Sequence, residues 1–154
     1  MRHVTITETS FTAGSRSTAR AGGTAIHQLL LPFPLAYFTG ALATDLAYWQ
    51  TADVMWERFS IWLIVAGLIM AGFAVIAAVI ELAASRQKPA WLRVSGYALA
   101  VLLALVNAFV HSRDGYTAVV PTGLTLSGLV VVILLATASA GWTLTYPRRV
   151  GVDI

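Results

Sequence analysis

The sequence predicts an all-α fold, an integral membrane four-helix up-down bundle with short loops, from three observations. Hydrophobic residues make up 58% of the 154 residues and charged residues only 11%, whereas soluble domains have about 25% charged residues. Four separate segments are long and apolar enough to cross a bilayer, which takes roughly 20 residues each. The segments between them are short, so helices that follow one another should pack as antiparallel neighbours. This composition excludes an intrinsically disordered protein and a soluble enzyme.

The four predicted spans differ in regularity. They cover about Leu29–Trp49, Phe59–Ala84, Trp91–Ser112 and Gly123–Tyr146. The first span has Pro32 and Pro34 in its opening turns, where a missing backbone N–H is tolerated, so its regular helix should begin near Phe33. The sequence leaves two interpretations of these prolines open, because they either kink this helix or start it.

Residues 26–146 form the predicted transmembrane domain, with a polar segment on either side. Residues 1–25 are rich in Ser, Thr, Gly and Ala, and their low hydrophobicity predicts a flexible cytoplasmic tail. Residues 147–154 form a short basic C-terminus on the same side. The chain has no cysteine, which excludes disulfides, iron–sulfur ligation and cysteine-based zinc sites within it.

The distribution of basic residues predicts the orientation. With four spans, the two termini and the second loop share one side, and only Arg58 and Arg113 lie on the other. The shared side holds eight of the ten Lys and Arg residues, namely Arg2, Arg16, Arg20, Arg86, Lys88, Arg93, Arg148 and Arg149. Because cytoplasmic loops are rich in Lys and Arg, both termini should face the cytoplasm of a bacterial inner membrane. The net charge of +3 then indicates contact with anionic lipid and not with nucleic acid.

Asp45 is the first candidate for function, because an ionisable residue within a span is costly to bury. It lies about one turn from the outer end of the first span, where Arg58, His111 or Arg113 could pair with it. A paired carboxylate at the membrane interface is the first interpretation, and a proton or cation role is the alternative.

Glu81 is its counterpart near the inner end of the second span. Arg86, Lys88 and Arg93 lie close to it in sequence. A structural ion pair, or a side chain that extends to the interface, is therefore the first interpretation, and a functional role is the alternative.

The histidines bear on haem binding, because a pair of histidines holds the haem of many small four-helix membrane bundles. His27 lies at the inner end of the first span and His111 at the outer end of the third. These ends are about 30 Å apart, so the two residues cannot bind one haem between them. No cofactor is the first expectation, and a haem held by His27 alone or with a partner's ligand is the alternative. Asn107 is four residues from His111, on the same helix face, which predicts a polar contact toward the outer loops.

No catalytic or metal-binding motif occurs in the chain, which has neither a His-x-x-x-His pair nor Glu-x-x-His. Small residues instead predict close helix packing, at Ala36-x-x-x-Gly40 in the first span and Ala136-x-x-x-Ala140 in the fourth. Packing within the chain is the first interpretation of these spacings. The alternative is a surface for a membrane-protein partner or a second copy.

Two stretches carry a family resemblance. The first span opens with Ile26-His27-Gln28-Leu29-Leu30-Leu31-Pro32-Phe33-Pro34-Leu35-Ala36, and the chain closes with Gly141-Trp142-Thr143-Leu144-Thr145-Tyr146-Pro147-Arg148-Arg149-Val150-Gly151-Val152-Asp153. Over residues 26–153 the chain resembles the bacterial membrane-protein family catalogued as domain of unknown function 2231. The resemblance implies four helices. It also implies, in typical relatives, a cytoplasmic histidine cluster able to hold a metal or haem, of which this chain keeps His27 but has Gln28 and Pro32 where the family has proline and histidine.

Three functions are compatible with these features, in the following order. The first is a small multi-pass inner-membrane protein without catalytic residues, which acts as a structural or accessory subunit. The second is a membrane redox protein that holds haem or a metal near His27. The third is a small transporter or proton-handling protein that uses Asp45 or Glu81.

Overall fold

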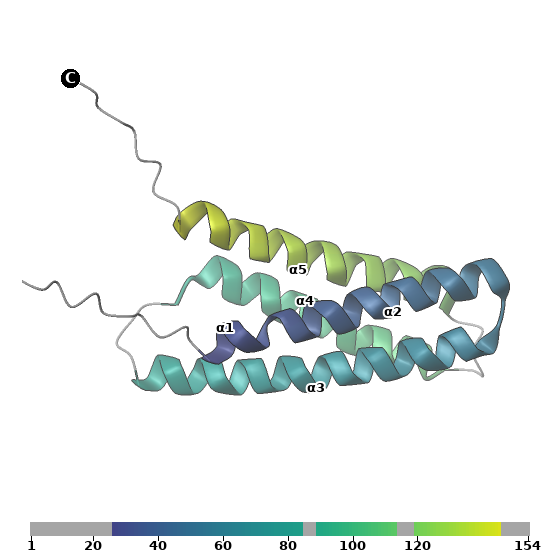
Figure 1. Cartoon of the computed structure of the whole chain (residues 1–154), viewed down its shortest axis with the longest axis horizontal. Coiled ribbons are helices and arrows are strands. Elements are labelled where there is room, and N and C mark those ends of the chain that lie inside the picture. The colour runs from purple at the N-terminus through teal and green to yellow at the C-terminus, as the bar shows by residue number, and fades with distance from the viewer. Residues whose placement is uncertain (1–25, 85–88, 114–118, 146–154) are drawn as a thin grey trace, which may run out of the picture.

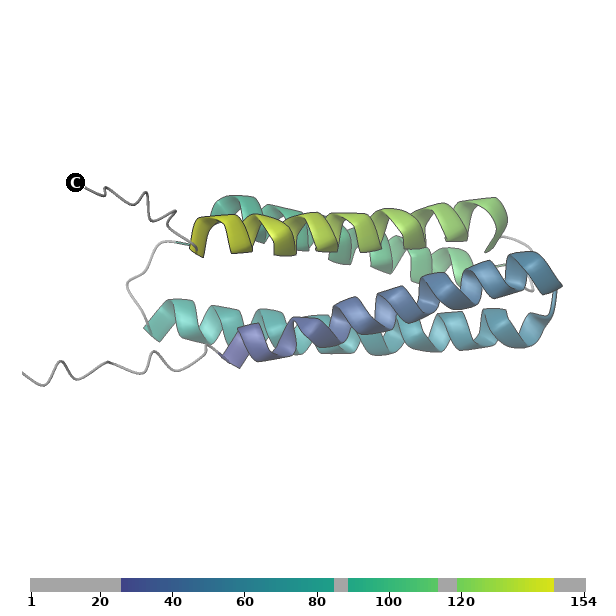
Figure 2. The same cartoon turned by 45° about the horizontal axis from the view of Figure 1, so that its top comes forward.

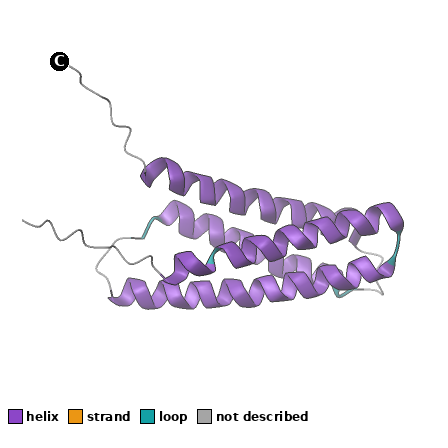
Figure 3. Cartoon of the chain, in the orientation of Figure 1, coloured by secondary structure: helices purple, strands orange, loops and turns teal. Residues whose placement is uncertain are grey.

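The structure, a computed structural model, is a bundle of long helices and describes residues 26–84, 89–113 and 119–145 (Figure 1). The elements are α1 (Ile26–Leu30), α2 (Pro32–Thr51), α3 (Val54–Ala84), α4 (Trp91–His111), the short turn η2 (Val119–Gly123) and α5 (Leu124–Thr145). Every regular element in these residues is helical (Figure 3). Four stretches are long and apolar enough to cross a membrane, namely Ile26–Thr51, Val54–Ala84, Trp91–His111 and Val119–Ser139. The predicted all-α membrane fold is confirmed.

The helices run up and down the bundle. The connection from α2 to α3 lies at one end, which we name the turn end, and η2 lies there too. The start of α1 and the end of α5 lie at the opposite end, which we name the termini end (Figures 1 and 2). The α2–α3 and α4–α5 pairs make the most extensive contacts, and α2 also packs on α5 and α3 on α4. All four spans therefore enclose one interior.

The two prolines lie in the first turn of α2, after the short helix α1. The chain is already helical from Ile26, and Leu31 keeps a helical backbone whose N–H donates to the carbonyl of His27 at 3.1 Å. Pro32 then opens α2, and neither proline supplies a backbone N–H for the helical ladder. The long helix α2 thus begins at Pro32, one residue before the predicted start near Phe33, and one further helical turn, α1, precedes it.

The second span begins earlier than Phe59, its predicted first residue. A tight turn at Ala52 and Asp53 separates α2 from α3, and α3 begins at Val54. Ala52 adopts a left-handed conformation with φ 54°, and its N–H donates to the Tyr48 carbonyl at 2.8 Å, which ends α2. The carboxylate of Asp53 accepts from the Met55 N–H at 2.9 Å, which caps the start of α3. As a result Glu57, expected in a loop, lies in a helix.

The middle of the bundle is packed with small and apolar side chains. Phe38, Ala41, Ile64, Ala104 and Val130 form its centre, with Ala100, Val131 and Leu134. Gly40 packs within the chain, because a Cβ there would lie 3.4 Å from Leu63 Cδ1. Large apolar side chains such as Trp62, Leu92 and Val132 cover the outside, which suits contact with lipid chains and not with water.

Candidate functional site

A cluster of buried polar side chains lies in the interior toward the turn end. Asp45 comes from α2, Ser60 from α3, Asn107 and His111 from α4, and Ser127 from α5, and each is at most 3% exposed. Asp45 lies about 9 Å along α2 from its end at Thr51. Each spanning helix thus places at least one polar side chain in the same enclosed space, which we name the polar cluster.

The cluster continues the inward faces of the helices. Residues three or four apart share one face of a helix. The buried positions of α2 are Pro34, Phe38, Ala41 and Asp45, those of α3 are Glu57, Ser60, Ile64, Gly67, Ala71 and Ala74, and those of α4 are Ala100, Ala104, Asn107 and His111. The buried helix faces that form the apolar core therefore carry polar side chains near the turn end.

Asp45 is the centre of the hydrogen bonds. Its Oδ1 accepts a short hydrogen bond from the Ser60 hydroxyl and lies 2.9 Å from His111 Nε2. Its Oδ2 accepts from the Ser127 hydroxyl at 2.5 Å, and Ser127 Oγ accepts from Asn107 Nδ2 at 2.8 Å. One carboxylate on α2 is therefore bonded directly to side chains of α3, α4 and α5.

The hydrogen bonds determine how many protons the Asp45–His111 pair carries. His111 Nδ1 lies 3.0 Å from the backbone carbonyl of Asn107, and a carbonyl can only accept, so Nδ1 carries a hydrogen. Between Nε2 and Asp45 Oδ1 one atom must also carry a hydrogen. The pair is then either imidazolium with carboxylate or imidazole with carboxylic acid, and its total charge is zero in both forms. A neutral pair is far cheaper to bury than an isolated charge.

Gly123 leaves the space that the imidazole of His111 occupies. A Cβ at this position would lie 2.7 Å from His111 Cε1, which is closer than real Cβ contacts come. The absence of a side chain at Gly123 therefore allows the His111 ring to turn toward Asp45.

Glu57 lies one helical turn from Ser60, on the side of the cluster nearer the turn end. Its side chain is fully buried, and neither carboxyl oxygen has a hydrogen-bond partner in the described part of the chain. It lies close enough to His111, Asp45 and Arg58 to interact with them electrostatically. Sequence reasoning placed Glu57 in a loop and missed it, although the spacing Glu57, Ser60, Ile64 continues one helical face.

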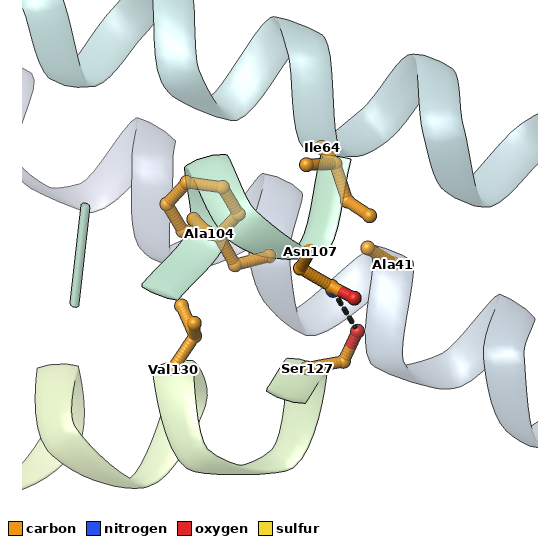
Figure 4. Close-up of a pocket in the computed structure, with 7 residues that line it drawn as sticks. Ala41, Ile64, Ala104, Asn107, Ser127 and Val130 are labelled. Atoms are coloured by element: carbon orange, nitrogen blue, oxygen red, sulfur yellow. Dashed lines mark hydrogen bonds between the residues drawn. The ribbon is translucent and has the colours of Figure 1, made fainter. Parts of the chain in front are cut away.

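The apolar core closes the cluster toward the termini end. Figure 4 shows a gap next to the Asn107–Ser127 hydrogen bond, which these two residues line together with Phe38, Ala41, Ile64, Ala104 and Val130. The gap is too small to admit a water molecule. The polar cluster therefore extends from the middle of the bundle toward the turn end, and Glu57 lies beyond it on that side.

A second polar contact lies near the termini end. His27 Nδ1 is 2.5 Å from Glu81 Oε2, and the His27 backbone N–H donates to Glu81 Oε1 at 3.2 Å. Both side chains are close to 30% exposed. Among the described residues the ion-pair partner of Glu81 is His27. Arg86 and Lys88 lie outside the described residues, so their pairing with Glu81 stays a prediction.

The structure brings together three of the five residues that the sequence singled out. Asp45, Asn107 and His111 share the polar cluster, and His111 is the one of three expected partners that binds Asp45. His27 and Glu81 meet at the other end. Sequence reasoning missed Ser60 and Ser127, because serines are common in membrane helices and nothing local marks their partners. Among the described residues no three His, Asp or Glu side chains lie close enough to hold a metal ion.

Comparison with protein families supports the resemblance seen in the sequence. A family model described as a predicted membrane protein, DUF2231, matches residues 23–154. No curated protein and no solved structure matches the chain. The match covers all four spans, and it confirms the family predicted from the two motif stretches.

Proposed function

This chain belongs to the DUF2231 family of predicted membrane proteins, and from that premise we propose that it is a structural or accessory subunit of the bacterial inner membrane. Residues 26–146 serve as its membrane domain, and both termini face the cytoplasm. The partner is another membrane protein or a second copy of this chain.

The hydrogen bonds of Asp45 to three other helices are the observation that supports this proposal. Helices in a bilayer gain little from burying apolar surface against one another, and packing and interhelical hydrogen bonds hold them together instead. In this chain Asp45 is bonded to Ser60, His111 and Ser127, each on a different helix. Such a centre keeps four helices in a defined arrangement, which is what a rigid subunit requires.

The experiment is purification of the tagged full chain from its native membrane in a mild detergent. We expect a defined complex, either with one stoichiometric membrane protein or with itself, on native gels and by mass measurement. Asp45→Ala should lose that complex if the arrangement of the helices forms the docking surface. Asp53→Asn, an exposed change at the same end, is the control and should keep it. A monodisperse monomer recovered with no partner would contradict the accessory role.

Proton binding is a second candidate, and the single shared proton of the Asp45–His111 pair favours it. Intramembrane ionisable residues mark proton and ion sites in many membrane proteins. The bond between His111 Nε2 and Asp45 Oδ1, at 2.9 Å, already holds one proton in an enclosed place. In membranes of the full chain, the ring-nitrogen NMR signals of His111 should respond to Asp45→Asn, and unchanged signals would contradict a shared proton.

A further inference from the structure

The unpaired carboxyl group of Glu57 is the unusual feature of the interior. Ser60, His111 and Ser127 are each hydrogen-bonded to Asp45. Glu57 is equally buried, but both of its carboxyl oxygens are unpartnered among the described residues. Burying an ionised carboxylate without a partner is very costly, and the neutral acid costs much less. The burial of Glu57 therefore favours the neutral acid over the carboxylate.

The surroundings of Glu57 allow that proton to be exchanged. The charged groups that act on it are His111 of α4, Asp45 of α2 and Arg58 of its own helix. The turn η2, with sequence VVPTG, and the first turns of α5, with LTLSG, bring no ionisable side chain. Within the part of the chain that the structure describes, the acid–base groups near Glu57 are thus the two members of the buried pair, with Arg58 as a further charge.

Ser60 is the next buried residue of α3 from Glu57 toward that pair, and no hydrogen bond joins it to Glu57. It lies three residues along the same face of α3, and its hydroxyl contacts Asp45 Oδ1 and lies 3.3 Å from His111 Nε2. Toward the termini end the apolar core closes the path, since the gap next to Asn107 and Ser127 admits no water. In the described residues, apolar packing therefore lies between the pair and the termini end.

We propose that Glu57 is the proton-exchange group of the polar cluster, through which the Asp45–His111 pair gains and loses its proton at the turn end. A proton from water at that end binds the Glu57 carboxylate and forms the neutral acid. The acid then gives it to the pair, directly or through the Ser60 hydroxyl, and Glu57 becomes a carboxylate again. No electrons are transferred. This inference rests on proton binding by the pair, the second candidate function above.

The test uses the full chain in oriented vesicles and two spectroscopic signals. The first is the infrared carbonyl band of a protonated carboxylic acid, and the second is the ring-nitrogen NMR signal of His111, assigned through its loss in His111→Asn. We expect Glu57→Gln to remove a carbonyl band and to slow deuterium exchange at His111 about 100-fold, the usual contribution of a placed proton-transfer group. Glu57→Asp should keep a shifted band. Asp53→Asn, an exposed acid at the same end, should leave both signals unchanged.

The side of the membrane from which protons reach Glu57 provides a second test. A pH step in the solution at the turn end should change the Glu57 band at once, and the same step at the termini end should not. Exchange at His111 that is unaffected by Glu57→Gln, or a response from the termini end, would overturn the role of Glu57. If Asp45→Asn also leaves the His111 signal unchanged, proton binding by the pair fails as well, so the two failures can be told apart.

Discussion

Asp45 is the residue on which the polar cluster depends, because its two carboxyl oxygens receive donors from three other helices. Its charge is compensated by the proton it shares with His111. If the Asp45 carboxyl group is removed, the hydroxyls of Ser60 and Ser127 and the imidazole of His111 lose their common partner inside the bundle.

Asp45→Ala should lower the free energy of unfolding by about 3 kcal/mol, because breaking a buried pair leaves an uncompensated partner. Unfolding of the full chain in lipid bicelles measures this. Asp53→Asn keeps the helix cap and should change the same quantity by less than about 0.5 kcal/mol, as exposed substitutions usually do. Equal effects of the two variants would show that the cluster does not stabilise the bundle.

Gly123 allows the His111 ring to reach Asp45, and an alanine there should displace it. The Cβ would meet His111 Cε1 at 2.7 Å, whereas at Gly128, on the next turns of the same span, nothing lies within 4 Å. We expect Gly123→Ala to cost about 1–3 kcal/mol of stability and to shift the His111 ring signals. Gly128→Ala is the matched control, and it should be neutral or slightly stabilising.

At the scale of the elements, close approach of α2 and α3 depends on a small residue opposite an aromatic ring. Gly67 on α3 faces Phe38 on α2, and a Cβ there would lie 2.6 Å from the ring carbon Cε1. Small residues of this kind allow membrane helices to pack at short range. The polar cluster needs this approach, because Ser60 and Asp45 belong to the same pair of helices.

Gly67→Ala should therefore separate α2 from α3 or displace Phe38, with a loss of about 1–3 kcal/mol of stability. Gly72 lies on the same helix with nothing within 4 Å of a Cβ. Gly72→Ala should raise stability by up to about 1 kcal/mol, because alanine favours a helix more than glycine does. Thermal unfolding of both variants in one detergent makes the comparison, and a similar loss in both would refute the packing argument.

At the scale of the whole molecule, the bundle has an apolar outside and two different ends. Arg58 and Glu57 belong to the turn end, and Arg93 and the His27–Glu81 pair to the termini end. The proposed orientation places the turn end outside the cytoplasm, since most Lys and Arg residues are in segments connected to the other end.

Single cysteines should report this orientation directly, because the natural chain has none. Asp53→Cys lies at the turn end and Ala90→Cys at the termini end, and both positions are exposed. In intact cells a membrane-impermeant maleimide should label Asp53→Cys only, and Ala90→Cys should react after the cells are opened. The reverse labelling pattern would show that the chain has the opposite orientation in the membrane.

The purified chain should show no Soret band in a reduced-minus-oxidised spectrum. His27 already binds Glu81 through Nδ1, and His111 binds Asp45 at the far end of the bundle, so the two histidines cannot act as a pair of axial ligands. Protein purified from cells that were grown with added haem precursor is the most stringent test of this expectation. A stoichiometric haem that is lost in His27→Ala would show that a partner or a distant residue completes the site.

Much of this architecture could be predicted from the sequence. Residence in the bilayer, the number of spans and the asymmetry of basic residues all follow from hydropathy and charge along the chain, because these are local properties. The start of the second span was predicted too late, at Phe59, because the polar residues Asp53, Glu57 and Arg58 lower the hydropathy of the first turns of α3. In the structure these turns belong to α3, which Asp53 caps, and Glu57 lies on the buried face of that helix.

The sequence by itself determined that this chain lives in a membrane as four helices and which few polar residues have to be accommodated there. The tertiary structure alone decided which of those residues meet. Ser127 is 82 residues from Asp45 in the chain, and their contact depends on how α2 and α5 are rotated about their axes. Rotation is determined by packing between helices, such as Gly67 against Phe38 and Gly123 against His111, and hydropathy along one helix does not specify it.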